Sequence, residues 1–308
     1  PACAGGGHYG VMMCQPRSAA RIVARFWVVL LTCFLISPVQ GAIRDGGINP
    51  SNLGKGEWIY QMNQAVGGYV PSVTNVTSLM IYLKNQGVRY IIVKAGTGAE
   101  LFGVPGFNPQ FTSSLVDQAH AACLWIFLYK LSFATNTAGE VAIADYVFQQ
   151  GADGFVWDAE AEWESSRIGT QGPELAIAQC SQVRSNWPSK FLAHSPFAYI
   201  TGHSSFPYKE FGYYCDAVMP QDYWVEFGET PTAVVTKMST QWRNWQNTLT
   251  GKWVSSIKPL VPAGQADHGK LSATPREPLL IPASAPLVTG TRAVVYVAVP
   301  GAQGRYEG

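Results

Sequence analysis

The stretch Asp153-Gly154-Phe155-Val156-Trp157-Asp158-Ala159-Glu160-Ala161-Glu162 joins a short apolar run to three carboxylates at alternate positions. The apolar run predicts a buried β-strand, and residues two apart in a strand point to the same face. Asp158 and Glu160 are therefore predicted to lie roughly 6–7 Å apart on one side of the strand end. Asp153 is assigned to the turn that enters the strand, and Glu162 to the solvated rim.

Two carboxyl groups held this close cannot both ionise freely, so the pKa of one of them is raised. A carboxyl that keeps its proton can serve as a general acid, and paired carboxyls are typical of enzymes that cleave glycosidic bonds. The alternative is a strand that simply runs into a solvated acidic turn. Because Asp158 and Glu160 follow the apolar run Phe155-Val156-Trp157, we favour the functional interpretation for this pair.

The regular spacing of apolar segments along the chain predicts the fold. Apolar runs recur at intervals of roughly thirty residues, which is the size of a βα unit. Strands that are apolar on both faces favour an α/β fold of the (β/α)8 TIM-barrel type, with an open doubly wound sheet as the alternative. No Gly-rich phosphate loop follows the first strand, which weakens a nucleotide-binding version of that sheet. Seven strands are predicted at Trp58–Met62, Tyr90–Lys94, Leu124–Leu128, Gly154–Asp158, Phe191–Ala193, Ala217–Met219 and Pro259–Pro262.

Helical patterns lie between these strands. Val76, Leu79, Met80 and Leu83 follow a helical period, and the segment from Val141 to Gln150 ends at Gly151, a natural stop. Further helices are predicted to begin at Pro173, where the missing N–H of proline is harmless, and to run from Val234 to Leu249.

The last βα unit is irregular in sequence. An eighth strand is predicted at 293–298, but the preceding segment contains four prolines that break any useful helix. Either the last unit is irregular, or the tail is foreign to the fold and the barrel lacks its final strand; the prolines favour the second interpretation. We therefore divide the chain into upstream residues and a signal peptide at 1–42, a linker at 43–56, a barrel of seven units at 57–266 and an irregular tail at 267–308.

The N-terminal residues predict an export signal. Three arginines, Arg17, Arg21 and Arg25, precede the apolar segment Phe26–Ile36, and small residues at 39–42 offer a cleavage site. The apolar segment is too short for a comfortable membrane span. We expect a secreted or periplasmic protein with no stable membrane anchor.

The composition of the chain limits the kinds of binding partner that we expect. The net charge is +1 and no Lys/Arg run is present, which argues against a nucleic-acid partner. Ten tryptophans and fourteen tyrosines supply aromatic faces on which sugar rings can stack. The histidines are scattered and no CxxC motif occurs, so neither a metal site nor a cofactor is predicted. We expect a monomer that binds a polysaccharide or an oligosaccharide.

In a barrel of this type the active site lies where the C-terminal ends of the strands meet. Asp158 and Glu160 are the predicted catalytic residues. Gln221 or Tyr223 could orient a sugar substituent, and Trp224 could stack on a sugar ring. The predicted substrate-binding residues at the strand ends are Gln61, Lys94, Tyr129, His194, Gln221, Asp222, Tyr223 and Trp224.

The segment from Asp153 to Glu160 resembles the fourth-strand signature D-G-x-D-x-D-x-E of the chitinase-type (family 18) glycoside hydrolases. The resemblance implies that Glu160 protonates the leaving oxygen and that Asp158 orients the acetamido group whose carbonyl attacks the anomeric carbon. It also implies that Gln221 and Tyr223 surround that acetamide. Val156 departs from the signature, because it stands where the first inner aspartate is expected. The Asp-x-Glu ending is also similar to that of the family 25 lysozymes, which are barrels that cleave peptidoglycan.

The sequence is compatible with three functions. The first is a secreted hydrolase of β-linked N-acetylated sugars, chitin or peptidoglycan, with Glu160 as the acid. The second is a barrel that binds carbohydrate without cleaving it, which the valine at position 156 supports. The third is a hydrolase of another class that uses Lys94 or His194, for example through a Schiff-base lysine.

Overall fold

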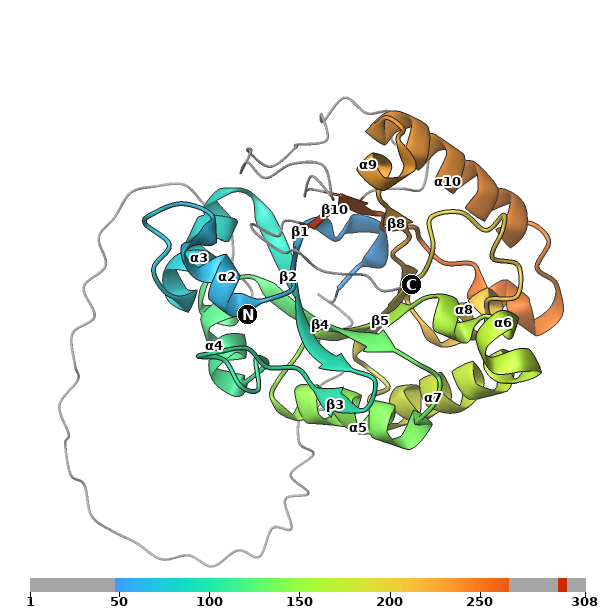
Figure 1. The fold of residues 1–308 in the computed structure, drawn as a ribbon, viewed down its shortest axis with the longest axis horizontal. Coiled ribbons are helices and arrows are strands. Elements are labelled where there is room, and N and C mark those ends of the chain that lie inside the picture. The colour runs from blue at the N-terminus through green and yellow to red at the C-terminus, as the bar shows by residue number, and fades with distance from the viewer. Residues whose placement is uncertain (1–47, 266–292, 298–308) are drawn as a thin grey trace, which may run out of the picture.

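The computed structural model describes residues 48–265 and 293–297. Their parallel sheet runs in the order β7-β6-β5-β4-β2-β1-β10-β9-β8, with β3 antiparallel beside β2. The two ends of this path, β7 and β8, are separated in the chain only by Met219 and Pro220, so the sheet curls round on itself (Figure 1). This arrangement confirms the predicted (β/α)8 barrel. The strands are β1 (Gly54–Ile59), β2 (Val88–Thr97), β3 (Glu100–Leu101), β4 (Trp125–Ser132), β5 (Gly154–Ala159), β6 (Phe191–Ser195), β7 (Ala217–Val218), β8 (Gln221–Asp222), β9 (Ala263–Gln265) and β10 (Ala293–Val297).

Helices surround the strands on the outside (Figure 1). The four helices predicted from the sequence are confirmed as α3, α5, α7 and α10. The turn after α5 contains Gly151 at a φ of 100°, a conformation that glycine adopts readily. The helices are α2 (Met62–Gly68), α3 (Val76–Asn85), α4 (Ser113–Ala121), α5 (Thr137–Gln149), α6 (Ser165–Ile168), α7 (Gly172–Asn186), α8 (Tyr208–Tyr214), α9 (Trp224–Phe227) and α10 (Pro231–Gln246), with short 3-10 helices η1 (Pro50–Asn52), η2 (Ala161–Trp163), η3 (Gly169–Gln171) and η4 (Gly251–Ser256).

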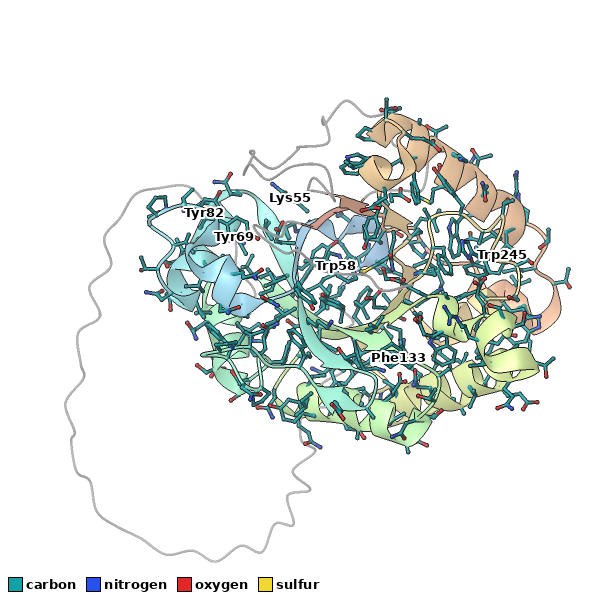
Figure 2. The ribbon with its side chains drawn as sticks, viewed as in Figure 1. Lys55, Trp58, Tyr69, Tyr82, Phe133 and Trp245 are labelled. Carbon is teal, nitrogen blue, oxygen red and sulfur yellow. The ribbon has the colours of Figure 1, made fainter. Side chains whose placement is uncertain are left out.

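Strand alternation divides the apolar residues into two cores. Trp58, Phe127 and Val156 belong to a core inside the barrel, whereas Trp157 packs in a larger core between the strands and the helices. Figure 2 shows Trp58 among the strands and Trp245 in the outer helical layer. In β5, therefore, the even-numbered residues face the interior, which brings Asp158 to the same side as Val156.

Most strand boundaries differ by a few residues from the sequence prediction, and at three of the strands the difference is informative. β1 begins at Gly54, within the predicted linker, because Lys55 already pairs with β2. The sixth strand is split into β7 and β8 because Pro220 has no N–H for the ladder. β9 begins at Ala263, just after Pro262 and not at Pro259, and only a single bridge from Leu260 to Val218 precedes it.

The predicted eighth strand corresponds in position to β10, whose backbone pairs in parallel with β1 and β9. The predicted signal peptide and most of the predicted irregular tail lie outside the described residues. No helix in residues 48–265 is both long enough and apolar enough to cross a lipid bilayer.

Candidate active site

Asp158 and Glu160 lie together where β5 ends inside the barrel mouth. Asp158 is 9% exposed, and Glu160, two residues further on, is partly exposed. Gln221 Nε2 donates to Asp158 Oδ1 and to Glu160 Oε1, in both cases over 2.9 Å. Because one nitrogen contacts both oxygens, these two oxygens lie within twice 2.9 Å of each other. The structure thus brings together two predicted catalytic residues and one predicted substrate-binding residue.

Burial is the chief cause that raises the pKa values of both carboxyls of the pair. The pKa of Asp158 is raised well above its ordinary value, chiefly by burial and then by the negative charge of Glu160, while Lys94 opposes the shift. Burial also raises the pKa of Glu160, and the hydrogen bond from Gln221 opposes that shift. The hydrogen bond between the two carboxyls raises the pKa of Asp158 and lowers that of Glu160. Asp158 therefore keeps the proton that the pair shares.

Gln221 owes its position to the break in the sixth strand. Its own N–H donates to Pro196 O at 3.0 Å, and its side chain makes a third contact with Ser195 O at 3.2 Å. Ser195 Oγ in turn donates to Met219 O at 2.8 Å. These bonds connect the ends of β6 and β8, so the amide of Gln221 is held over both carboxyls.

Lys94 lies on the interior side of β2, close enough to Asp158 for an electrostatic interaction. It is 7% exposed, and its ammonium lies 4.5 Å from the ring centroid of Tyr60 and 4.7 Å from that of Phe102. Gln110, which is 1% exposed, fixes this unit: its amide nitrogen donates to Lys94 O at 2.9 Å and Tyr60 O at 3.0 Å. Gln110 is not among the residues predicted from the sequence, because a single glutamine in a loop carries no pattern.

Three more of the predicted residues lie on the strands and loops around this end of the barrel. Tyr129 is buried in the interior, with its ring centroid 4.8 Å from that of Trp58. Trp224, in α9, is only 3% exposed, so its indole does not offer the free face that the predicted sugar stacking requires. Tyr223 precedes that helix and is partly exposed.

The structure does not bring His194, Asp222 or Gln61 to the acid pair. His194 faces outward from β6, because alternation turns Ala193 and Ser195 inward, and its ring stacks on Phe211 at 5.4 Å. Asp222 is fully buried, and within the described residues neither of its carboxylate oxygens has a hydrogen-bond partner. Burial raises the pKa of Asp222 well above the ordinary value. Gln61 precedes α2, where its backbone carbonyl accepts bonds from the first turn.

A buried polar cluster supports the acid pair from the outer side of the strands. The Glu140 carboxylate of α5 accepts bonds from Ser132 Oγ at 2.5 Å, Gln179 Nε2 at 2.9 Å and Phe133 N at 3.0 Å, and it pairs with the Lys130 ammonium. Both charged side chains of the Lys130–Glu140 pair have no exposed surface. Burial lowers the pKa of Lys130 to about 8, although Glu140 acts to raise it.

Trp163 connects this cluster to the acid pair. Its indole N–H donates to Ser132 O at 3.0 Å, and its backbone N–H donates to Glu160 O at 3.0 Å. Ser132 also lies opposite Ala159 in the β4–β5 register. The residue between Asp158 and Glu160 and the turn that follows are therefore both anchored at the end of β4.

The arrangement is suited to proton transfer beside a bound polar substrate. One carboxyl holds a proton, its neighbour accepts a hydrogen bond from it, and an amide donor contacts both. Val156, directly below Asp158 on the same face, is fully buried in the apolar interior. No second carboxyl of β5 therefore lies beneath Asp158 to take its proton.

Comparison with known proteins supports the TIM-barrel fold described above. No protein-family model and no curated protein sequence matches the chain. A GH18 chitinase from Pseudoalteromonas aurantia superposes with a TM-score of 0.51 at 11% identity, over 78% of this chain and 93% of that one. An endo-β-N-acetylglucosaminidase from Cordyceps militaris gives a TM-score of 0.48 at 12% identity, over 80% and 81%. At these identities the likeness to the chitinase shows a shared TIM-barrel fold.

Proposed function

We propose that the protein is a glycoside hydrolase that cleaves β-linked N-acetylated sugars, with Glu160 as the general acid. The observation that carries the proposal is the hydrogen-bonded unit of Asp158, Glu160 and Gln221 at the C-terminal end of the barrel strands. Active sites of this fold lie at that end. The likeness to a chitinase barrel and the resemblance of the β5 sequence to the family 18 signature support the same assignment.

The spacing of the carboxyls favours a nucleophile supplied by the substrate. Inverting glycosidases hold their two carboxyls about 6.5–9.5 Å apart to leave room for a water molecule. Asp158 and Glu160 hydrogen-bond to each other and lie on the same side of one strand, so neither can activate a water on the far face of the sugar ring. The acetamido carbonyl oxygen of the substrate can attack that face from within the molecule.

The proposed reaction has two steps. As the acetamide N–H approaches Asp158, the shared proton passes to Glu160, which donates it to the glycosidic oxygen. The acetamido oxygen bonds to the anomeric carbon while the bond to the leaving group breaks. In the second step the Glu160 carboxylate takes a proton from water, the hydroxide adds to the anomeric carbon, and the acetamide is restored. Gln221 orients both carboxyls throughout.

Val156 supports a second candidate function, a barrel that binds the same sugars without cleaving them. Because this side chain is apolar and fully buried, β5 itself offers no second carboxyl to the Asp158 proton, and the carboxyl that hydrogen-bonds to Asp158 is Glu160, just beyond the strand. A binding protein would show saturable tryptophan-fluorescence changes with an N-acetylated oligosaccharide and no new reducing ends after long incubation. Release of reducing ends would exclude this candidate.

A substrate without acetyl groups tests the proposed nucleophile. We expect the protein to cleave an oligosaccharide of N-acetylglucosamine and to leave the fully deacetylated oligosaccharide intact, because an amine has no carbonyl oxygen to attack the anomeric carbon. Chromatography of products after equal incubation measures the difference. Equal cleavage of both oligosaccharides would contradict the substrate-assisted route.

The raised pKa values predict the pH dependence of the reaction. The pair must carry one proton, so kcat/KM should fall as the pH rises through the raised pKa at which that proton is lost. An isolated glutamic acid loses its proton at about pH 4.3. The alkaline limb of the profile should therefore lie clearly above that pH, measured with the N-acetylglucosamine oligosaccharide. A limb at the ordinary value would show that the pair does not share the catalytic proton.

A further inference from the structure

Lys94 is a buried cation inside the barrel with no anionic partner in the described part of the chain. Its side chain is 7% exposed, and none of the ion pairs within residues 48–265 includes it. Burying an ammonium without a carboxylate is unfavourable. The rings of Tyr60 and Phe102, at 4.5 and 4.7 Å, offset part of that cost through cation–π attraction.

Asp158 is the carboxyl whose charge acts on the pKa of Lys94, yet it does not neutralise the Lys94 ammonium. Burial and the neighbouring Glu160 outweigh the effect of Lys94 on the Asp158 carboxyl, which keeps its proton. The negative charge of the acid pair then resides on Glu160, which is already bonded by Gln221. The positive charge of Lys94 thus stays available to a ligand.

The position of Lys94 is built by the fold. Gln110 uses both amide hydrogens on the carbonyls of Lys94 and Tyr60, and its oxygen accepts the Met62 N–H at 2.8 Å. The backbone segments that carry Lys94 and Tyr60 are therefore tied together through Gln110, and Lys94 interacts electrostatically with Asp158 of the acid pair. A polar group positioned in advance favours a specific ligand over solvent.

We propose that Lys94 binds a carboxylate carried by the substrate, so that the preferred glycan bears acidic ether substituents, as peptidoglycan does, and is not neutral chitin. This inference rests on the proposed function, since it assigns the substrate class of the same site. A carboxylate completes the ion pair that the chain itself leaves open. An ammonium–carboxylate hydrogen bond in a partly dehydrated site is stronger than one between neutral groups.

Two glycans that differ only in the charge of their substituents test whether Lys94 binds a carboxylate. The first is a soluble glycan of alternating N-acetylglucosamine and N-acetylmuramic acid, and the second is the same glycan with its carboxylates converted to amides. We expect the wild-type protein to prefer the acidic glycan at least tenfold in kcat/KM, which is about 1.4 kcal/mol. Lys94→Met should remove this preference, and Lys94→Arg should retain part of it.

A control variant distinguishes the effect of removing the Lys94 charge from the effect of removing any lysine. Lys252 is exposed on η4, where its ammonium lies 4.6 Å from the ring centroid of Trp253, and Lys252→Met should keep the full preference. Equal kcat/KM for both glycans in the wild type would overturn the inference. So would an equal loss on both glycans in Lys94→Met, because Lys94 would then act through Asp158 or the fold.

Binding measured without turnover distinguishes this inference from the proposed function. Dissociation constants for both glycans, followed by tryptophan fluorescence in the Glu160→Gln protein, should show the same tenfold preference. If the wild type cleaves neither glycan but binds the acidic one more tightly, the proposed function fails and the Lys94 inference stands. If it cleaves both without preference, the Lys94 inference alone fails.

Discussion

Glu160→Gln is expected to lower kcat for an N-acetylated glycan by roughly 10²–10⁴-fold, the usual contribution of a positioned general acid. The amide keeps the size of the side chain, and its oxygen can still accept the bond from Gln221 Nε2, so the local structure should persist. It has no acidic proton for the leaving oxygen. Initial rates of reducing-end release measure the effect, and fluorescence titration should show that binding persists.

Glu162→Gln is the matched control for this substitution. It makes the same chemical change two residues along the chain, in the short helix η2, where the charge of the partly buried Glu162 acts on the acid pair. We expect a change of less than about fivefold in kcat, since removing a nearby charge shifts the pKa of the pair without removing a proton donor. Full activity in Glu160→Gln would refute the assigned acid.

Glu140→Ala is expected to lower the free energy of unfolding by about 3–5 kcal/mol, the usual effect of removing one partner of a buried ion pair. The substitution leaves the Lys130 ammonium buried without its carboxylate, and it removes the acceptor of Ser132, Gln179 and the Phe133 N–H. Urea denaturation followed by far-UV circular dichroism measures the change.

Two further variants show whether the expected loss of stability in Glu140→Ala comes from leaving a charge buried without a partner. Lys130→Met with Glu140→Leu removes both charges and should recover part of the lost stability, because no uncompensated charge remains. Lys237→Ala removes an exposed ion pair, with Lys237 Nζ 2.9 Å from Glu229 Oε1, and should cost less than about 1 kcal/mol. A loss below 1 kcal/mol in Glu140→Ala would show that the cluster does not stabilise the barrel.

The barrel and its acid pair could be predicted because both follow from strand periodicity. Apolar runs at the spacing of βα units predicted the order of elements, and period-two alternation placed Asp158 and Glu160 on one face. The same rule also explains the failure at His194: Ala193 and Ser195 face inward, so the residue between them faces the helices. Alternation, applied to β6 as it was to β5, predicts that placement.

Contacts between distant segments could not be predicted from one sequence. Gln110 reaches Lys94 and Tyr60 from a loop, and nothing in its neighbours marks it. The Lys130–Glu140 pair joins a strand to the following helix, and a charged residue in each is commonly solvent-exposed. Gln221 was predicted as a ligand of the substrate, whereas the structure shows that it bonds the two carboxyls themselves.

The central claim is that the Asp158–Glu160 pair hydrolyses a glycosidic bond, and its most direct test detects the oxygen atom that water adds to the product. The wild-type protein is incubated with an N-acetylated glycan in water enriched in heavy oxygen, and the products are weighed by mass spectrometry. Hydrolysis at the Asp158–Glu160 pair predicts shorter oligosaccharides that carry one heavy oxygen at each new reducing end, and no such products from the Glu160→Gln protein. An intact glycan that nevertheless binds the wild-type protein would contradict the claim and identify a carbohydrate-binding barrel.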